Sequence, residues 1–536
     1  MPVVLRKSTE LPEPVAYERW CAVAGATATI DTRPTVKNLG IRLEKAFEAI
    51  RDRWWELGRA LGATPSAELA HMPTCGTYTS DFGVMLAWAK LVGELASETS
   101  RTLVLCDDPW LFRHLSRLPG VKAGKPPKLL LTTLWLFLRG FIARFHVALR
   151  VMIRSRRTQT MRGAHGRGEA IFLVYAHPIS DTKGKDAYFG DLMKAIPETK
   201  RLLHTLPPNE HGIHLCDDER TACVDAWGSL LTAVTLPFAL WRPSKKEKNL
   251  AEGWLIRRAA SLEGGSGSAA VNRWQIACQT SWLIDRRPRS VIWPWENHPW
   301  ERALVRTARR LGILTAGYQH TVIGPHMFNQ SPASNPDGLD SIPDLIICNG
   351  PAYYNNLVEW GIPEERLVIG GALRLAQPGK LRHDPDGPVF VALSNDDAFA
   401  WQMIDTLKKI DTGQKRFLIK SHPYFSIDFE ETDTIRCTNT MLQDQTGVSA
   451  VIYCTGTVGL EAILGGLPTI RFRPNGYVAM NILPSGITVE TVDAYSLADA
   501  LSNMKKPPAY SWNDVLAPEN IEVWKRVLSA ELLETE

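Results

Sequence analysis

Two segments in the C-terminal part of the chain decide the fold class: FLIKSHPY at residues 417–424 and VIYCTGTVGLEAILGGLPTIRFRPNG at residues 451–476. Each begins with a short apolar run, which is typical of a buried strand. The first run is followed by the polar triplet KSH, and the second by the turn CTGT and a helical pattern. This order of strand, polar turn and helix is typical of a parallel α/β sheet.

Ligands of open α/β sheets bind at the carboxyl ends of the strands, where these polar residues lie. A turn rich in Gly and Thr before a helix offers free backbone N–H groups and the positive end of the helix dipole. A cationic strand end beside it adds charge, so the sequence predicts a phosphate-binding site. Its candidate residues are Lys420, Ser421, His422, Thr455, Gly456 and Thr457.

Strands alternate with helices along most of the chain, and a Pro- and Gly-rich stretch at residues 377–388 divides the alternation into two halves. We therefore predict an α/β fold of two doubly wound, Rossmann-like parallel sheets that face across a cleft. The first domain spans residues 1–376, residues 377–388 form the hinge, and the second domain spans residues 389–515. Residues 516–536 form a closing helix that can pack back on the first domain.

Polar residues also follow three predicted strands of the first half, SVIWPW, ILTAGY and EAIFLVYA. The first strand leads to Glu296 and His298, the second to His320, and the third to a polar loop with Asp181. A single His after a strand is more often structural, and the Asp181 loop is equally compatible with a plain connection. Two such strand ends in succession favour a functional site. We predict that the four residues include a general base, and that His320 donates to a phosphate or sugar oxygen.

The charge of the chain is unevenly distributed. The net charge of the 536 residues is +4, but residues 121–168 contain 11 Lys and Arg and no Asp or Glu. The rest of the chain therefore carries a net charge of −7. This distribution argues against a general nucleic-acid binder and indicates a local anionic partner.

The segment KLLLTTLWLFLRGFIARFHVALRVMI at residues 128–153 is strongly apolar, yet arginines interrupt it. Its longest uncharged run covers residues 129–138, whereas a spanning helix needs about 20 apolar residues. A basic helix with aromatic side chains fits the plane of an anionic membrane, and we predict this for the basic insert at residues 121–168. A core helix and a spanning segment are the alternatives. The predicted membrane-contacting residues are Trp135, Phe137, Arg139, Arg144, Arg150 and Arg154.

The spacing of the cysteines and the N-terminal residues indicate the cellular compartment of the protein. The nine Cys are scattered, and none form a CxxC pair. The first residues, MPVVLRKSTELPEP, lack the apolar region of a signal peptide. We expect a reduced, cytoplasmic environment, with the protein peripheral on the inner face of the plasma membrane.

Several of these motifs resemble those of GT-B glycosyltransferases of bacterial surface-polysaccharide assembly. KSHP at residues 420–423 resembles the HP motif of capsule Kdo transferases, polysialyltransferases and CDP-glycerol glycerophosphotransferases. TGTVGLEAILGGLP at residues 455–468 resembles the STxGLEAxxxGxP signature of Kdo-type enzymes, and GYQH at residues 317–320 is similar to their GxQHG element. Thr321 stands where Gly is usual, and Cys454 and Thr455 replace Asn and Ser. The resemblance covers residues 290–475.

The resemblance implies a metal-independent glycosyltransferase that needs no cofactor besides its nucleotide-sugar donor. His422 would hold the donor phosphate with Lys420 nearby, residues 455–457 would contact it, and Glu461 would lie toward the nucleotide ribose. The HP motif favours a CMP-linked acidic sugar such as Kdo or a sialic-acid relative, with UDP-sugars still open. The acceptor would be a lipid-linked surface glycan, of lipopolysaccharide or capsule. The rival interpretations are a sugar-nucleotide epimerase and a non-catalytic subunit of a polysaccharide assembly complex.

Overall fold

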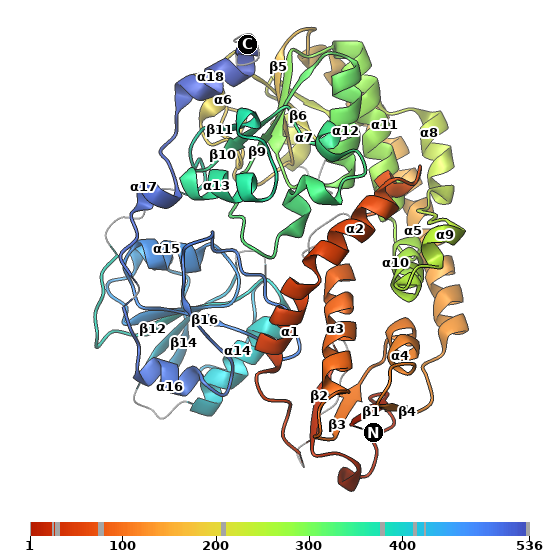
Figure 1. Cartoon of the computed structure of the whole chain (residues 1–536). Helices are drawn as coiled ribbons and strands as arrows, with labels where there is room; N and C mark the ends of the chain where they lie inside the picture. The colour runs from red at the N-terminus through yellow and green to blue at the C-terminus, as the bar shows by residue number, and fades with distance from the viewer. Residues whose placement is uncertain are drawn as a thin grey trace.

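The computed structural model describes the chain except residues 1, 24–25, 27–29, 31–32, 73–79, 205–210, 376–380, 411–414, 423–424, 507 and 532–536. Its described strands form three sheets, of seven, six and four strands, with helices packed around them (Figure 1). All strand pairs of these sheets are parallel, and the order of the two larger ones reverses at an internal strand. The predicted α/β class with doubly wound parallel sheets is confirmed.

The seven-stranded sheet has the order β11-β10-β9-β8-β5-β6-β7. The chain runs outward from β5 in one direction and then returns to build β8 on its other side. The topological switch point therefore lies between the paired strands β5 and β8, and ligands of such sheets bind at its carboxyl edge. The strands are β5 (Ala170–Val174), β6 (Lys200–Leu203), β7 (Thr221–Cys223), β8 (Ser290–Pro294), β9 (Leu314–Tyr318), β10 (Leu345–Cys348) and β11 (Leu367–Ile369).

The six-stranded sheet has the order β14-β13-β12-β15-β16-β17, with β12 as the strand at which the order reverses. In Figure 1 it lies below the seven-stranded sheet, with α13, α15 and α17 between the strands of the two. Those helices span Pro351–Glu359, Val458–Leu464 and Trp512–Val515. The strands are β12 (Val389–Ala392), β13 (Phe417–Lys420), β14 (Ile435–Cys437), β15 (Ala450–Tyr453), β16 (Thr469–Phe472) and β17 (Glu490–Val492).

The N-terminal residues form a third sheet, of order β2-β3-β1-β4, whereas the sequence predicted a single first domain over residues 1–376. Its strands are β1 (Val3–Arg6), β2 (Arg19–Ala22), β3 (Thr102–Leu105) and β4 (Val121–Ala123). The strands of residues 1–376 thus divide between two sheets. The physical reason is α5 (Leu129–Thr158), which follows β4 and at 1.5 Å per residue carries the chain roughly 45 Å before β5 begins.

The remaining helices pack on the sheets or on one another, as α8 and α10 do on α5. They are α1 (Leu39–Ala49), α2 (Arg51–Gly62), α3 (Phe82–Leu95), α4 (Pro109–Leu115), α6 (Leu192–Ala195), α7 (His211–Leu215), α8 (Leu230–Thr235), α9 (Lys245–Lys248), α10 (Gly253–Gly264), α11 (Ser268–Arg286), α12 (Pro299–Arg310), α14 (Asp397–Ile410), α16 (Leu497–Ser502) and α18 (Ile521–Ser529). The last of these, α18, packs against β5 and β8 of the seven-stranded sheet. There Trp524 is fully buried, and its indole N–H donates to the carbonyl of Gly370 at 3.0 Å.

A buried ion network joins the N-terminal unit to the six-stranded sheet. Glu44 on α1 is 3% exposed at its side chain and lies 2.6 Å from the guanidinium of Arg471 on β16. The second oxygen of Glu44 pairs with Arg473. Because both cations come from the six-stranded sheet and the carboxylate comes from α1, this network fixes the two units to each other.

The long helix α5 is attached to the protein along a narrow stripe. Gly140 lies so close to the α10–α11 connection that a Cβ there would meet the backbone oxygen of Gly264 at 1.8 Å. Arg144 is 1% exposed and donates to the carbonyls of Pro237 (3.0 Å) and Gly264 (2.6 Å). The prediction that Arg144 contacts a membrane is therefore wrong, because its guanidinium supplies the hydrogen bonds that hold α5 in place.

The opposite face of α5 is apolar and exposed. Trp135 and Phe137 expose 57% and 55% of their surface, and the guanidinium of Arg139 lies 4.7 Å from the ring centre of Trp135. Arg150 is exposed and Arg154 is half-buried. Within the described residues, every helix is too short or too polar to cross a bilayer.

The close approach at Gly140 gives a stability prediction. Gly140→Ala forces a methyl group into the Gly264 carbonyl, so we expect it to lower the free energy of unfolding by about 1–3 kcal/mol, as overpacking does. Gly163→Ala is the matched control, because a Cβ there would have no neighbour within 4 Å. Urea unfolding followed by circular dichroism measures both. Equal midpoints for the two variants would contradict this packing of α5.

Candidate functional site

Polar side chains gather at the carboxyl edge of the seven-stranded sheet, beside the switch point. Glu296 and His298 follow β8, and His320 follows the neighbouring strand β9. One oxygen of the Glu296 carboxylate lies 2.6 Å from Nε2 of His298, and the other lies 3.6 Å from Nε2 of His320. The structure thus places three of the four predicted catalytic residues in one contact group, which we call the Glu296 cluster.

The surroundings of the cluster shift the pKa of its carboxylate and the pKa of the His320 imidazole by different causes. Burial would raise the pKa of Glu296, but the hydrogen bond from His298 and neighbouring charges, including that of Arg374, lower it to about 2. Burial lowers the pKa of His320 to about 4, against the attraction of Glu296. At neutral pH an ionised carboxylate therefore faces a neutral His320 imidazole, which can donate a hydrogen bond without adding charge.

A second carboxyl group, Glu301 on α12, positions the turn that carries the cluster. It is 1% exposed and accepts hydrogen bonds from the Trp293 indole N–H (2.9 Å) and from the backbone N–H groups of Glu296 (3.1 Å) and Asn297 (3.0 Å). Burial raises its pKa to about 7. Glu301 was not predicted as a site residue, although its position in the first turn of the helix after β8 is visible in the sequence.

The same turn is held in an unusual backbone conformation. Asn297 has φ of 57°, in the left-handed region that few non-Gly residues adopt. Its side-chain amide donates to the carbonyl of Asn329 at 2.6 Å, and the amide of Asn329 donates back to the carbonyl of Glu296 at 2.7 Å. A strained residue fixed by reciprocal hydrogen bonds is typical of sites that must hold side chains precisely.

Three further side chains from distant segments surround the cluster. The ring of Tyr188 lies edge-on to His320 with centroids 5.4 Å apart, and Arg374 lies 5.3 Å from the centre of that tyrosine ring. His71 comes from the N-terminal unit and meets the ring of His298 at 5.7 Å. Neither His71 nor Arg374 was predicted, because no pattern in the sequence links residues so far apart.

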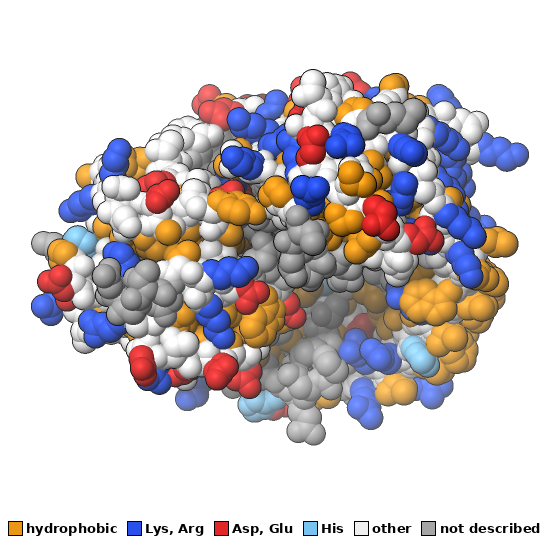
Figure 2. Space-filling view, turned by 90° about the horizontal axis from the view of Figure 1, so that it is seen from below, with side chains coloured by type: hydrophobic (Ala, Val, Ile, Leu, Met, Phe, Trp, Pro, Cys, Tyr) orange, Lys and Arg blue, Asp and Glu red, His pale blue; other side chains and the backbone are white. Residues whose placement is uncertain are grey.

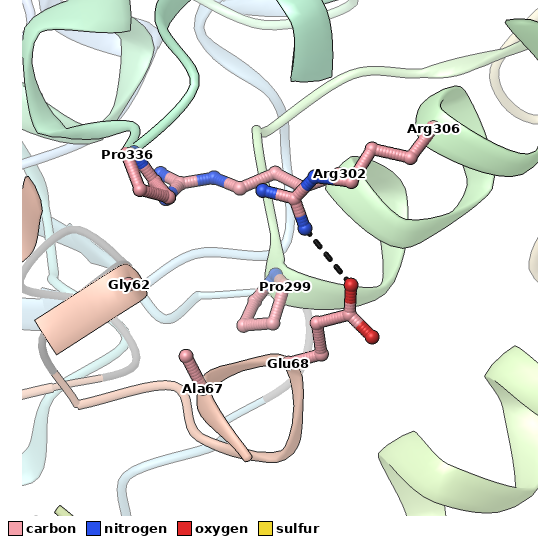
Figure 3. Close-up of a pocket in the computed structure, with 7 residues that line it drawn as sticks. All are labelled: Gly62, Ala67, Glu68, Pro299, Arg302, Arg306 and Pro336. Carbon is pink, nitrogen blue, oxygen red and sulfur yellow. Dashed lines mark hydrogen bonds and ion pairs between the residues drawn. The ribbon is translucent and has the colours of Figure 1, made fainter. Parts of the chain in front are cut away.

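A small cavity lies at the N-terminal part of α12, next to the turn that carries the cluster. Arg306 on α12 pairs with Glu68 at 2.9 Å and with Asp337 at 2.6 Å, and Figure 3 shows this arginine reaching toward Glu68 across the N-terminal part of α12. The cavity between them has a volume of about 10 Å³ and is bounded by Pro299 and Pro336. That volume holds about one water molecule, so this cavity is too small to admit a substrate.

Asp181 lies apart from these contacts. Its carboxylate accepts hydrogen bonds at 2.9 Å from the backbone N–H groups of Lys183 and Lys185, within its own loop. The same loop is fixed by Asp186, which lies 3.6 Å from the buried guanidinium of Arg201. The hydrogen bonds of Asp181 are those of a loop-shaping residue.

The carboxyl edge of the six-stranded sheet carries the second group of predicted residues. Ser394 follows β12 and Thr455 follows β15, and their hydroxyl oxygens lie 3.0 Å apart. Gly456 has φ of 120°, so the turn requires glycine for its backbone although the space beside it is open. Ser394 was not predicted, but the end of the apolar run before it marks its position. We call Ser394 and residues 420–422 and 455–457 the donor-side strand ends.

The remaining donor-side residues differ in their hydrogen bonds and in their burial. Lys420 at the end of β13 donates from Nζ to the carbonyl of Asn439 at 3.0 Å. The Ser421 hydroxyl accepts from the backbone N–H of Ile427, and burial lowers the pKa of the half-buried His422. Burial raises the pKa of Glu461 on α15. The last residue of the KSHP motif lies outside the described residues.

The fold and these two strand-end sites define the class: an α/β protein with two doubly wound parallel sheets and polar groups at the carboxyl edge of each. No model of a known protein family matches the chain. No curated protein matches it either.

Several solved structures are similar to part of the chain. The UDP-N-acetylglucosamine 2-epimerase from Rickettsia bellii is 12% identical over 69% of this chain and 95% of its own, with a TM-score of 0.35. CalG4, the calicheamicin glycosyltransferase, is 12% identical over 68% and 94%, with a TM-score of 0.39. Anabaena HepE in complex with UDP is 11% identical over 62% and 89%, with a TM-score of 0.36. At such low identities and TM-scores, none of these likenesses assigns an activity to this chain.

Proposed function

We propose that this protein is a metal-independent GT-B glycosyltransferase that uses a nucleotide-sugar donor. The observation that carries the proposal is the Glu296 cluster, in which a carboxylate contacts two imidazoles beside a topological switch point. The donor-side strand ends supply a second polar edge with the phosphate-binding chemistry of the KSHP and TGTVGLEA motifs. Together they offer one site for each substrate.

The chemistry divides between the two sites. The acceptor hydroxyl loses its proton as its oxygen attacks the anomeric carbon of the donor, so a base must stand beside it. Glu296 is ionised and hydrogen-bonded to His298, so the pair takes up this proton as the carboxylate orients and stabilises the charged imidazole. His320, neutral at pH 7, donates to an oxygen of the sugar or the phosphate.

The leaving nucleotide carries the bond electrons away on its phosphate. Lys420, His422 and the hydroxyls of Thr455 and Thr457 are the groups that would stabilise this charge, with Glu461 toward the ribose. From the motif resemblance we propose a CMP-linked acidic sugar, such as Kdo or a sialic-acid relative, as the donor. We propose a lipid-linked glycan of lipopolysaccharide or capsule as the acceptor, reached at the inner face of the plasma membrane.

A donor panel tests the function. Purified protein is given CMP-, CDP- and UDP-sugars with a lipid-linked acceptor extract, and nucleotide release and sugar transfer are measured. We expect transfer with one donor class and a roughly 100-fold lower rate for His422→Ala, since a phosphate contact is lost. His383→Ala is the matched control. The exposed His383 forms a backbone bridge with Val448, which precedes β15 and so lies at the amino edge of the same sheet.

The other outcomes separate the rival functions. A changed sugar without transfer to the acceptor identifies an epimerase. No turnover of any donor, with or without acceptor, contradicts the enzyme proposal and favours a non-catalytic subunit of an assembly complex.

A further inference from the structure

The apolar outer face of α5 continues onto a second element that lies almost 100 residues further along the chain. α8 and the following short helix η5 (Leu236–Phe238) pack beside α5. Phe238 meets Phe141 of α5 with ring centroids 6.1 Å apart. Leu231, Val234 and Phe238 expose 80%, 58% and 67% of their surface. The two elements therefore form one continuous apolar surface, on the side of the molecule where Figure 1 shows α5 and α8.

The extent of this surface is unusual for a protein that remains in water, because large exposed apolar patches mark interaction sites. On α5 the exposed apolar residues are Leu130, Leu131, Leu134, Trp135, Phe137, Leu138, Phe141, Ile142, Phe145, Leu149 and Ile153. Even the two threonines on this stretch bond back to the backbone of their own helix: Thr132 donates to the carbonyl of Lys128 (2.7 Å) and Thr133 to that of Leu129 (2.9 Å). The face thus presents few unsatisfied polar groups.

The charges around the surface indicate its occupant. Residues 121–168 and 229–244 contain basic residues and no Asp or Glu. In Figure 2 hydrophobic side chains gather at the right-hand edge, the side on which α5 runs in Figure 1, with Lys and Arg among them. A stripe of apolar and aromatic side chains bordered by arginines matches the boundary between acyl chains and anionic headgroups. A second copy fits worse, because a symmetric contact would bring the arginines of two α5 helices together.

We propose that α8 and η5 complete, with α5, a two-element docking surface for an anionic phospholipid bilayer. The proposal deepens the membrane part of the proposed function and rests on it for its biological purpose. The bilayer contact itself needs neither donor nor acceptor. Arg144 and Gly140 hold α5 rigidly from behind, so the surface is presented as a fixed plane and is not assembled on binding.

Vesicle flotation of the full-length protein tests the surface without any sugar chemistry. The vesicles are phosphatidylcholine alone or phosphatidylcholine with phosphatidylglycerol. We expect wild type to float with the anionic vesicles and Leu231→Glu combined with Phe238→Glu to lower the partition coefficient about tenfold or more, because α8 and η5 then carry charge into the apolar layer. Trp401→Glu is the control expected to float like wild type, because Trp401 is an exposed aromatic residue of α14, which follows β12.

Three results would overturn the proposal. Wild type that binds neither vesicle removes the bilayer as the occupant. A double variant that floats like wild type, while Leu134→Glu with Phe137→Glu on α5 does not, removes α8 and η5 from the surface. Sedimentation showing a wild-type dimer that the double variant loses assigns the surface to a second copy. Because flotation uses no donor, a failure here is distinguishable from a failure of sugar transfer.

Discussion

Replacing Glu296 by Gln is expected to lower the rate of sugar transfer by about 10²–10⁴-fold while the protein stays folded. The amide keeps the size of the side chain but removes the charge that faces His298 at 2.6 Å and His320 at 3.6 Å. Without that carboxylate, the imidazole of His298 loses the partner that orients it and stabilises its protonated form. The measurement is the initial rate of transfer from the donor identified by the panel, with circular dichroism to verify folding.

Asp181→Asn is the matched control for this experiment. It makes the same change of carboxylate to amide after a strand of the same sheet, but Asp181 uses its oxygen to accept N–H groups of its own loop, which an amide oxygen also does. We expect it to retain most of the activity. A Glu296→Gln enzyme as active as Asp181→Asn would show that the cluster is structural and would leave the proton to another group.

The second large effect is expected from Glu44→Ala, which should lower the free energy of unfolding by about 3–5 kcal/mol. The substitution removes the carboxylate from a buried network and leaves Arg471, whose side chain is 1% exposed, as an uncompensated cation. It also releases Arg473. Urea unfolding monitored by tryptophan fluorescence measures the loss.

Glu48→Ala, one turn along α1, is the matched control. Glu48 lies 3.0 Å from the buried His326, but its own side chain is 54% exposed, so its removal should cost about 0.5–1.5 kcal/mol, the net contribution of one hydrogen bond. Glu44→Met combined with Arg471→Met should recover much of the loss, because apolar residues of similar size remove the unpaired buried charge. Equal midpoints for Glu44→Ala and Glu48→Ala would refute the role given to this network.

The sequence predicted the Glu296 cluster because its members follow successive strands. Consecutive β-α units of a parallel sheet place neighbouring strands side by side, and β8 and β9 pair directly. Polar residues at both strand ends must then lie close together. The donor-side strand ends follow this rule only in part: β12 pairs with its successor β13, whereas β15 pairs with β12 because the order of the sheet reverses there.

The prediction of membrane contact failed for Arg144, because α5 carries arginines on several of its faces. Arginines recur along α5, and the sequence placed Arg144 with the others at a membrane. Its burial depends on the approach of Gly140 to Gly264, the last residue of α10, more than 100 residues further along the chain. The exposed face of α8 was equally invisible, because an apolar run predicts burial and only the packing shows which side chains find partners.

The sequence by itself determined the α/β class, the alternation of strands and helices that makes the two larger sheets parallel, and the residues at the strand ends. These features follow from local patterns: apolar runs, turn residues and the adjacency of successive strands. Only the tertiary structure decided that residues 1–123 build a separate sheet, that His71 and Arg374 reach the Glu296 cluster, and that α5 and α8 share one exposed surface. Each of these depends on contacts between segments far apart in the chain, and such contacts leave no periodic signal in the sequence.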